Sequence, residues 1–439
     1  MQQKIDFNLL YLLTSVLILS SYFFGFYIDE DAGGGGKVDF VKKEWGNINL
    51  FLDSKISSIL ADPRYASGRT PLYLIVNKFN PFTENMNQFR ISYLVFATTI
   101  PILFFIFLKK NFKFVNLNIL IFLSCTLMVS PYFRTMSFWA DQEGLAIFFL
   151  LLSLISFSHL SNLDFYHNKK KYYLLSIITL FLSSLSFYSD QKYIFLSIFI
   201  YYSLITKNNF KFFFNYSLMG VIFALPALYL FYVWGGLLPI ESQFRLVFSP
   251  SGFNYFFSII GIYLIPIFII LFFEKKIIKL FLNLKKIDLF YFLIISVILF
   301  LTLPESPKFN GVGVVFKFLS LITSKLGVSW NLILSIYYIL NLFFLFLFLI
   351  FFKKNFKNYI FFTVYALGFM STFIVHQQYV DPLFFLLIFS YFSFIDEIKI
   401  FSNKYIISYF LFYFFLLLGA LYYRNICLIY FLKAACQVG

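Results

Sequence analysis

Three acidic residues follow one another where an apolar stretch of the chain ends. Asp29, Glu30 and Asp31 come directly after residues 7–26, which are long and apolar enough for a helix that crosses a bilayer. Carboxylates at a membrane boundary cost solvation free energy, so they are generally kept for a purpose. A carboxylate can take the proton from a hydroxyl nucleophile. We expect Asp29 to be such a base, with Glu30 second, and a solvated acidic turn is the alternative.

Other charged side chains lie in short polar segments between apolar runs. Arginine, lysine or histidine there could steady a departing phosphate, and carboxylates could orient substrate hydroxyls. Pairing with local acids, helix capping and a structural histidine remain the alternatives. The candidates for phosphate or other substrate contact are Arg64, Arg69, Arg134, Lys192 and His376, and the candidates for hydroxyl contact are Asp141 and Glu143.

The composition indicates a membrane protein with many spans. Of the 439 residues, 61% are hydrophobic and only 13% are charged, which excludes a soluble globular domain of this size. The three cysteines have no metal-ligand spacing, and no phosphate-binding glycine loop or Ser/His/Asp arrangement is present. The paired acids could ligate Mg²⁺ or Mn²⁺, although no spacing requires a metal cofactor.

Apolar runs predict an all-α fold of about thirteen transmembrane helices in one integral-membrane domain, 1–439. Alternate connections then differ in charge: one side carries 19 bases and 6 acids, the other 16 bases and 14 acids. The basic side is expected in the cytoplasm, so the net charge of +15 indicates topology and contact with membrane lipids and not nucleic acid. The predicted spans are 8–27, 90–108, 115–131, 144–160, 173–189, 193–206, 213–233, 255–273, 289–303, 331–352, 359–375, 382–395 and 406–423.

Two outer segments are longer than a connection needs. In the first, 28–90, apolar residues from Val41 to Ile59 recur at spacings of three and four, which predicts an amphipathic helix along the membrane surface. The second, 304–330, repeats this pattern through Val315, Phe318 and Ile322. Polar chemistry is therefore expected on the outer face.

A first span that ends in Asp-Glu, a long first outer loop and a later acid that opens a span resemble the GT-C glycosyltransferases. The resemblance implies a membrane enzyme that takes its sugar from a polyprenyl-phosphate donor. In that family the acid of the first loop is the usual candidate base, and by match it falls on Asp29, with Glu30 beside it. Asp141 matches the later acid.

Within this class, the N-terminal half resembles the dolichyl-phosphate-glucose α-1,2-glucosyltransferases. The chain departs from that pattern where Asp31 and a glycine run replace Phe-His, and where Asp190 replaces an arginine. The matching segments are Tyr27-Ile28-Asp29-Glu30, Asp62-Pro63, Thr70-Pro71-Leu72-Tyr73-Leu74, Phe138-Trp139-Ala140-Asp141 with Gly144, and Tyr188-Ser189-Asp190-Gln191.

These features together predict an inverting hexosyltransferase whose acceptor is a lipid-linked glycan, a lipid or a protein. The absence of an Asn-x-Ser/Thr site from the predicted outer loops and the lysine- and phenylalanine-rich composition favour a bacterial inner membrane, with the active site facing the periplasm. Two alternatives stay open. An O-antigen-type polymerase or ligase would place its long outer loop late in the chain, and a transporter or flippase of lipid-linked sugars would carry ionisable groups at mid-span.

Overall fold

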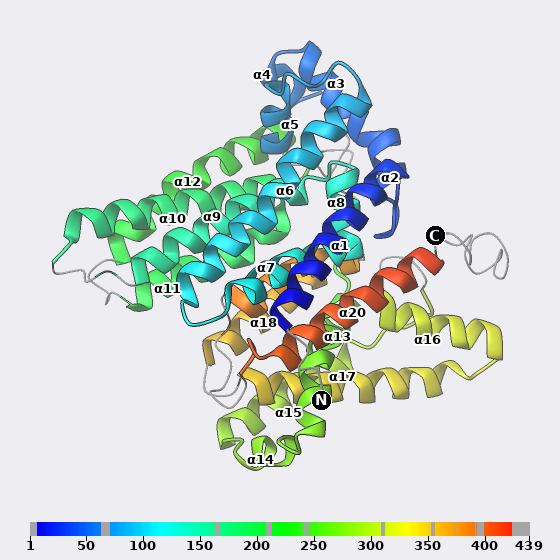
Figure 1. Ribbon diagram of the computed structural model, residues 1–439. Helices are drawn as coiled ribbons and strands as arrows, with labels where there is room; N and C mark the ends of the chain where they lie inside the picture. The colour runs from blue at the N-terminus through cyan, green and yellow to red at the C-terminus, as the bar shows by residue number, and fades with distance from the viewer. Residues whose placement is uncertain are drawn as a thin grey trace. The chain divides into compact units, whose positions relative to one another are not determined.

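The computed structural model is all-α over the residues that it describes. These are 7–62, 71–161, 167–207, 213–239, 246–308, 312–352, 356–372, 374–390 and 399–423, with the single residues 163, 243 and 392. Within them the only β-type pairing is an isolated bridge between Leu246 and Thr372. Figure 1 shows the helices in chain order. The all-α prediction is confirmed.

The chain divides into two compact units, each described by itself. Unit 1 comprises 1–128 and 132–244, and unit 2 comprises 129–131 and 245–439. The single domain expected over 1–439 stays a prediction. The helices from the first part of the chain are α1 Phe7–Tyr27, α2 Gly36–Asp39, η1 Phe40–Glu44, α3 Trp45–Asp53, α4 Ile56–Ile59, α5 Pro71–Lys78, α6 Met86–Asn111, α7 Leu117–Thr126, η2 Leu127–Val129, α8 Pro131–Phe138, α9 Glu143–Ser161, α10 Lys169–Ser189, η3 Gln191–Tyr193, α11 Ile194–Lys207 and α12 Phe213–Trp234.

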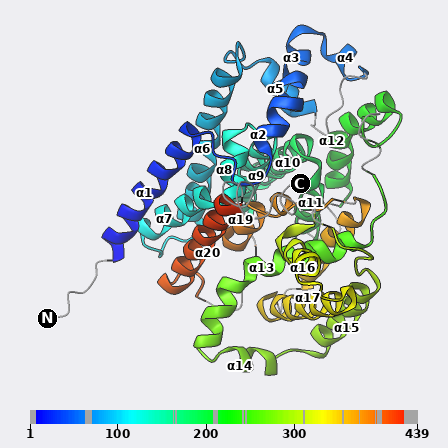
Figure 2. The same ribbon diagram turned by 90° about the vertical axis from the view of Figure 1, so that its right-hand side faces the viewer.

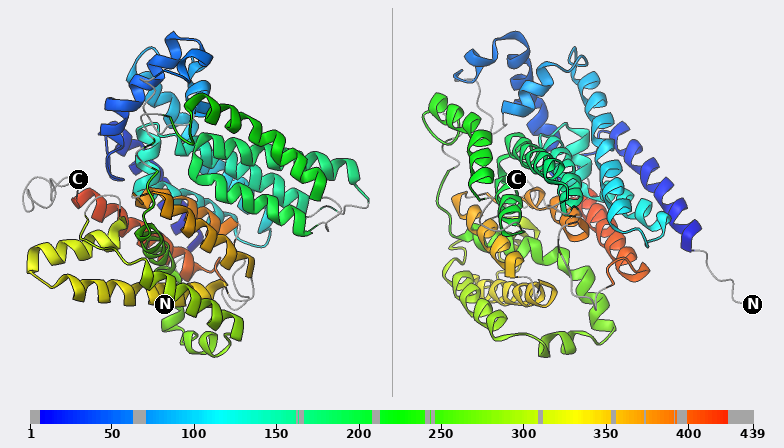
Figure 3. Two further views of the ribbon diagram at one scale, coloured as in Figure 1. Left: turned by 180° about the vertical axis from the view of Figure 1, so that it is seen from behind. Right: turned by 90° about the vertical axis from the view of Figure 1, so that its left-hand side faces the viewer.

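Unit 2 is built around one long helix, α13, which contacts α16, α17, α18, α19 and α20. Helices α16 and α17 lie side by side as a hairpin (Figure 3). The bounds are α13 Ser251–Phe273, α14 Ile277–Leu282, α15 Lys286–Leu301, α16 Gly313–Leu326, α17 Trp330–Phe352, α18 Phe356–Gly368, η6 Phe369–Ser371, η7 Gln377–Tyr379, α19 Leu383–Ser390 and α20 Asn403–Tyr422.

Among the described residues, eight helices are long and apolar enough to cross a membrane. They are α1, α6, α9, α10, α12, α13, α17 and α20, and the bent pair of Leu117–Val129 with Pro131–Phe138, at 71°, could be a ninth. These are the helices of an integral membrane protein. Four further predicted spans coincide with the shorter helices α11, α15, α18 and α19, so the count of thirteen stays a prediction.

The described part of the long first connection contains five short helical elements. Helices α2 to α5 and η1 gather where α1 ends and α6 begins (Figures 1 and 2). The amphipathic pattern is realised in two pieces, because Ser54 has an extended backbone that ends α3. Ile48 and Ile59 are buried, whereas Val41 is exposed. Phe40 is fully buried and stacks on Phe89, which ties this connection to the start of α6.

The second predicted segment contains α16, but its apolar stripe does not face the interior. Phe318 is exposed, whereas Phe316, Leu319 and Ser320 are buried. Gly327, with φ of 62°, ends the helix in the left-handed conformation that glycine adopts most easily.

Helices α9 and α10 pack closely through small hydroxyl side chains. Ser153 Oγ donates to the carbonyl of Thr179 at 3.0 Å, and Ser186 Oγ donates to the carbonyl of Ala146 at 2.8 Å. Small polar residues let membrane helices approach and hydrogen-bond across the interface. The packing of α9 against α10 holds α9 in place, and with it Glu143 at the start of α9.

We expect Ser153→Leu to lower the free energy of unfolding by roughly 1–3 kcal/mol, because the larger side chain overpacks this interface. Ser184→Leu is the matched control, since Ser184 Oγ donates to the Leu180 carbonyl of its own helix at 2.9 Å. Thermal unfolding in lipid nanodiscs would measure both variants. Equal losses would contradict close packing at Ser153.

Candidate functional site

Helix α1 ends in a hydrogen-bonded turn that places Asp29 and Glu30 differently. The amide of Glu30 donates to the carbonyl of Gly25 at 2.9 Å, and the amide of Asp29 donates to the carbonyl of Phe26 at 3.1 Å. This is the Schellman pattern, in which the residue after the cap adopts the left-handed conformation. Asp29 does so with φ of 57°. Glycine is the ordinary choice there, so an aspartate at this position carries a backbone cost of about 1–2 kcal/mol.

The turn directs Glu30 inward to a buried ion pair with Arg134 of α8. Arg134 Nε and Nη2 each lie 2.6 Å from one carboxylate oxygen of Glu30, so the contact is bidentate. Both side chains are nearly inaccessible, at 2% exposure for Arg134 and 6% for Glu30. Arg134 Nη2 also donates to the carbonyl of Ser21 at 2.8 Å. The guanidinium and the carboxylate thus satisfy each other.

Gly25 leaves the space that this ion pair occupies. A Cβ atom at Gly25 would lie 2.2 Å from Arg134 Nη2 and 2.6 Å from Glu30 Oε2. Neither atom can move away without weakening the pair. Gly25 is therefore required for the ion pair between Glu30 and Arg134.

Asp29, in contrast, remains partly open to solvent beside two cations. Its Oδ1 lies 2.8 Å from Arg90 Nη2, and its Oδ2 lies 3.3 Å from Lys37 Nζ. The Asp29 and Lys37 side chains are 46% and 49% exposed, whereas that of Arg90 is 8% exposed. Burial raises the pKa of Asp29, but Arg90 and Lys37 outweigh it, so the pKa is lowered overall. Asp29 is ionised at neutral pH.

Arg90 and Trp139 connect the end of α1 to the end of α8. Arg90 Nε donates to the carbonyl of Phe138 at 2.9 Å, and its guanidinium carbon lies 3.8 Å from the Trp139 ring centroid. Trp139 Nε1 donates to the carbonyl of Glu30 at 2.9 Å. An aromatic face next to a guanidinium gains cation–π energy and restricts the orientation of Arg90.

The glycine run after the acids forms an ordered loop around Asp31. Its carboxylate accepts the amides of Gly35, at 3.3 Å, and Gly36, at 3.0 Å. A Cβ on Gly36 would lie 2.5 Å from Thr135 Cγ2, and the amide of Gly33 donates to Thr135 Oγ1 at 2.6 Å. These glycines allow the loop to approach α8 closely, and they hold Asp31 in a structural role.

The end of α8 repeats the geometry of the end of α1. Ala140 has φ of 49°, and the amide of Asp141 donates to the carbonyl of Met136 at 2.9 Å. A left-handed alanine is uncommon and is maintained by its surroundings. The hydroxyls of Tyr73 and Tyr93 donate to the carbonyls of Ala140 and Asp141.

Beyond this turn, Asp141 accepts the amide of Glu143 at 3.3 Å, as expected for a residue that opens a helix. Glu143 is buried and pairs with Lys192, whose Nζ also lies 3.3 Å from Asp190 Oδ2. Burial lowers the pKa of Lys192, but Asp190 and Glu143 raise it more, so its net shift is upward. The local ion pair considered for Lys192 is therefore present, and it includes a second acid.

The structure brings together part of the predicted site. Asp29, Glu30 and Arg134 meet at the end of α1, and Asp141, Glu143 and Lys192 meet at the start of α9. Arg64 and Arg69 lie outside the described residues. His376 belongs to unit 2, where its ring contacts that of Tyr379.

Sequence reasoning missed Arg90 and Lys37. Arg90 stands at the start of a membrane helix, where an arginine is costly and therefore informative. Lys37 gave no comparable signal, because it follows a glycine run whose path cannot be deduced from sequence.

The described part of the chain contains no group of three or more His, Cys, Asp or Glu side chains that could hold a metal ion. Asp29 and Glu30, the two acids considered for Mg²⁺ or Mn²⁺, instead contact cationic side chains.

Comparison with known proteins identifies no relative: no protein-family model, curated protein or solved structure matches the chain.

We expect Gly25→Ala to cost about 2–5 kcal/mol of unfolding free energy, because the added methyl group separates a buried ion pair. Gly46→Ala is the control, since nothing lies within 4 Å of a Cβ built there. Thermal unfolding of the purified proteins would compare them. A Gly25→Ala variant as stable as Gly46→Ala would show that the close contact is absent.

Proposed function

We propose that this protein is a GT-C-type glycosyltransferase that moves a sugar from a polyprenyl-phosphate donor to a lipid-linked glycan, a lipid or a protein. The single observation that carries the proposal is the contrast between two adjacent acids at the end of the first membrane helix. Glu30 is closed into an ion pair, whereas Asp29 is ionised, partly exposed and flanked by two cations. An open carboxylate beside cations suits a reaction that removes a proton and releases a phosphate.

In the proposed reaction the Asp29 carboxylate accepts the proton of the acceptor hydroxyl. The acceptor oxygen forms a bond to the anomeric carbon from the face opposite the leaving group. The bond from that carbon to the phosphate oxygen breaks, and the polyprenyl phosphate leaves with its electrons. One displacement inverts the configuration. The lowered pKa of Asp29 makes it a weak base, so most proton transfer would occur late, when the hydroxyl has already become acidic.

Lys37 is the first choice for the donor phosphate. Its side chain is about half exposed, and its ammonium group already lies beside Asp29. Arg134 and Lys192, which the sequence also suggested for this role, are buried against carboxylates, and a phosphate would have to displace those partners. We therefore assign Arg134 a structural role, in which its ion pair with Glu30 stabilises the turn at the end of α1. Arg64 and Arg69 remain proposals for the same phosphate.

Asp141 is proposed to orient a substrate hydroxyl. Its carbonyl is held by Tyr93 and its carboxylate by the amide of Glu143, so its position is fixed by two contacts. Glu143, paired with Lys192, would act through the position of that helix start. His376, which belongs to unit 2, stays a proposed substrate contact.

The proposed setting is a bacterial inner membrane with about thirteen spans, a GT-C-like fold and the site facing the periplasm. The basic side of the chain supports this orientation through the positive-inside rule. The polymerase or ligase and the transporter or flippase remain the alternative functions.

We expect Asp29→Asn to reduce turnover by about 10²-fold or more, because it removes the base while the side chain keeps its shape. The measurement is the release of polyprenyl phosphate from a panel of labelled polyprenyl-phosphate sugars by protein in nanodiscs. Asp39→Asn is the matched control, since Asp39 is an exposed acid that pairs with Lys43 at 3.3 Å.

Asp29→Gly separates catalysis from folding in the same assay. Glycine relieves the left-handed backbone, which offsets part of the cost of losing the contact with Arg90, so this variant should still fold, as thermal unfolding would show, and still lack turnover. Donor turnover that survives in both Asp29 variants would remove Asp29 from the reaction. Absence of turnover with every donor in the wild type would favour the alternative functions.

We expect the acid limb of the activity–pH profile to lie below the ordinary aspartate pKa of 3.8, because the pKa of Asp29 is lowered and only its ionised form accepts a proton. Lys37→Met removes one cause of the lowering, so the limb should move to higher pH. Lys43→Met, next to Asp39, should leave it in place. Profiles of kcat/KM for the three proteins would show this, and an unmoved limb in Lys37→Met would contradict the assignment.

A further inference from the structure

Unit 2 contains a carboxyl group that is completely shielded from solvent. Asp381 lies in the connection between η7 and α19 and has 0% exposure. The sequence places it beside His376 in an outer connection, where an exposed acid would be expected. The structure instead buries it against membrane helices.

Hydroxyl groups from distant parts of the chain surround Asp381. Ser130 Oγ donates to Asp381 Oδ2 at 2.7 Å, and the Tyr413 hydroxyl donates to Oδ1 at 3.0 Å. Tyr263 supplies a third hydroxyl to the same carboxyl group. The Tyr263 hydroxyl in turn accepts from Gln377 Nε2 at 3.1 Å. The result is a polar cluster inside unit 2.

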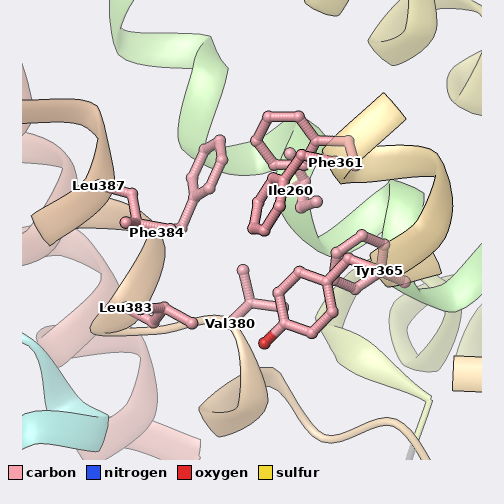
Figure 4. A pocket seen from close by; sticks show the side chains of 9 residues that line it. Ile260, Phe361, Tyr365, Val380, Leu383, Phe384 and Leu387 are labelled. Carbon is pink, nitrogen blue, oxygen red and sulfur yellow. The ribbon is translucent and has the colours of Figure 1, made fainter. Parts of the chain in front are cut away.

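This cluster lies at the level of the middle of two candidate membrane spans. Tyr263 is near the centre of the 23-residue α13, and Tyr413 is near the centre of the 20-residue α20. The neighbouring side chains are apolar: Val380 and Leu383, on either side of Asp381 and Pro382, line a small pocket with Ile260 (Figure 4). An ionisable group in such a position generally has a function.

No cationic side chain in the described part of the chain pairs with Asp381. The groups that face it from the packed elements are the hydroxyls of Ser130, Tyr263 and Tyr413. Of the other titratable groups nearby, Tyr409 donates to the Tyr263 carbonyl, and His376 contacts a tyrosine ring. Burial of a carboxyl without a cation favours its neutral form.

Both protonation states of Asp381 can be satisfied by the same partners. In the ionised state the hydroxyls donate to the two carboxylate oxygens. In the neutral state the carboxyl O–H can donate to Ser130 Oγ, because a hydroxyl oxygen also accepts. The proton can therefore leave and return without rebuilding the cluster.

We propose that Asp381, together with Ser130, Tyr263 and Tyr413, forms a proton-binding site in the membrane interior of unit 2. The ligand is a single proton, which is bound in the neutral carboxyl group and released to leave a carboxylate held by hydroxyl donors. This site rests on no step of the proposed sugar transfer. It gives unit 2 a charge that appears and disappears with pH.

Infrared difference spectroscopy of the full chain in nanodiscs tests this site directly. Between pH of about 5 and about 9, the wild type should lose the C=O stretching band of one protonated carboxyl group as the pH rises. Asp381→Asn should abolish that band. Asp288→Asn is the matched control, because Asp288 is also buried and accepts from a tyrosine hydroxyl, that of Tyr359, at 3.0 Å. It should leave the band unchanged.

Tyr413→Phe keeps the proposal testable if Asp381→Asn does not fold. It removes one donor to the carboxylate, so the midpoint of the band should move to higher pH. A wild type with no such band, a band that persists in Asp381→Asn or a midpoint that Tyr413→Phe leaves unmoved would overturn the site. Loss of the band on addition of sodium chloride at constant pH would also overturn it, because the ligand would then be a cation.

Discussion

Two opposite charges buried together determine how the first membrane helix ends. Glu30 and Arg134 are both nearly inaccessible, and removing one partner of such a pair generally costs about 3–5 kcal/mol because the other charge is left unpaired. The ion pair occupies the space that a side chain at position 25 would fill, so it requires Gly25. It also requires α1 to end in a turn that points Glu30 inward. The left-handed conformation of Asp29 makes that turn. The rest of the site follows from this geometry.

The same turn separates the roles of neighbouring residues. Because Glu30 is held inward, Asp29 stays near solvent, where Arg90 lies against its carboxylate and against the ring of Trp139. A carboxylate kept ionised and open by fixed neighbours is prepared for a substrate hydroxyl, which is the basis of the proposed sugar transfer. Asp381 shows the opposite arrangement, since it is shielded from solvent and its carboxylate accepts from hydroxyl groups of the described residues.

Sequence periodicity and hydropathy predicted the all-α membrane fold and the approximate positions of the eight long apolar helices found among the described residues, because long apolar runs leave few alternatives. They also singled out Asp29, Glu30 and Arg134. They could not show that Glu30 and Arg134 contact each other, since the residues are 104 positions apart and each also fits a substrate role. The burial of Asp381 could not be predicted from the sequence either, because its partner Ser130 lies 251 positions away.

Footprinting of carboxyl groups by mass spectrometry tests the central claim most directly, since it needs no knowledge of the sugar or the acceptor. The full chain in nanodiscs would react with a water-soluble carboxyl reagent, with and without polyprenyl phosphate. We expect Asp29 to be modified at least about 10-fold faster than the buried Glu30, and polyprenyl phosphate to protect Asp29. Equal modification of the two acids, or no protection of Asp29, would contradict the account.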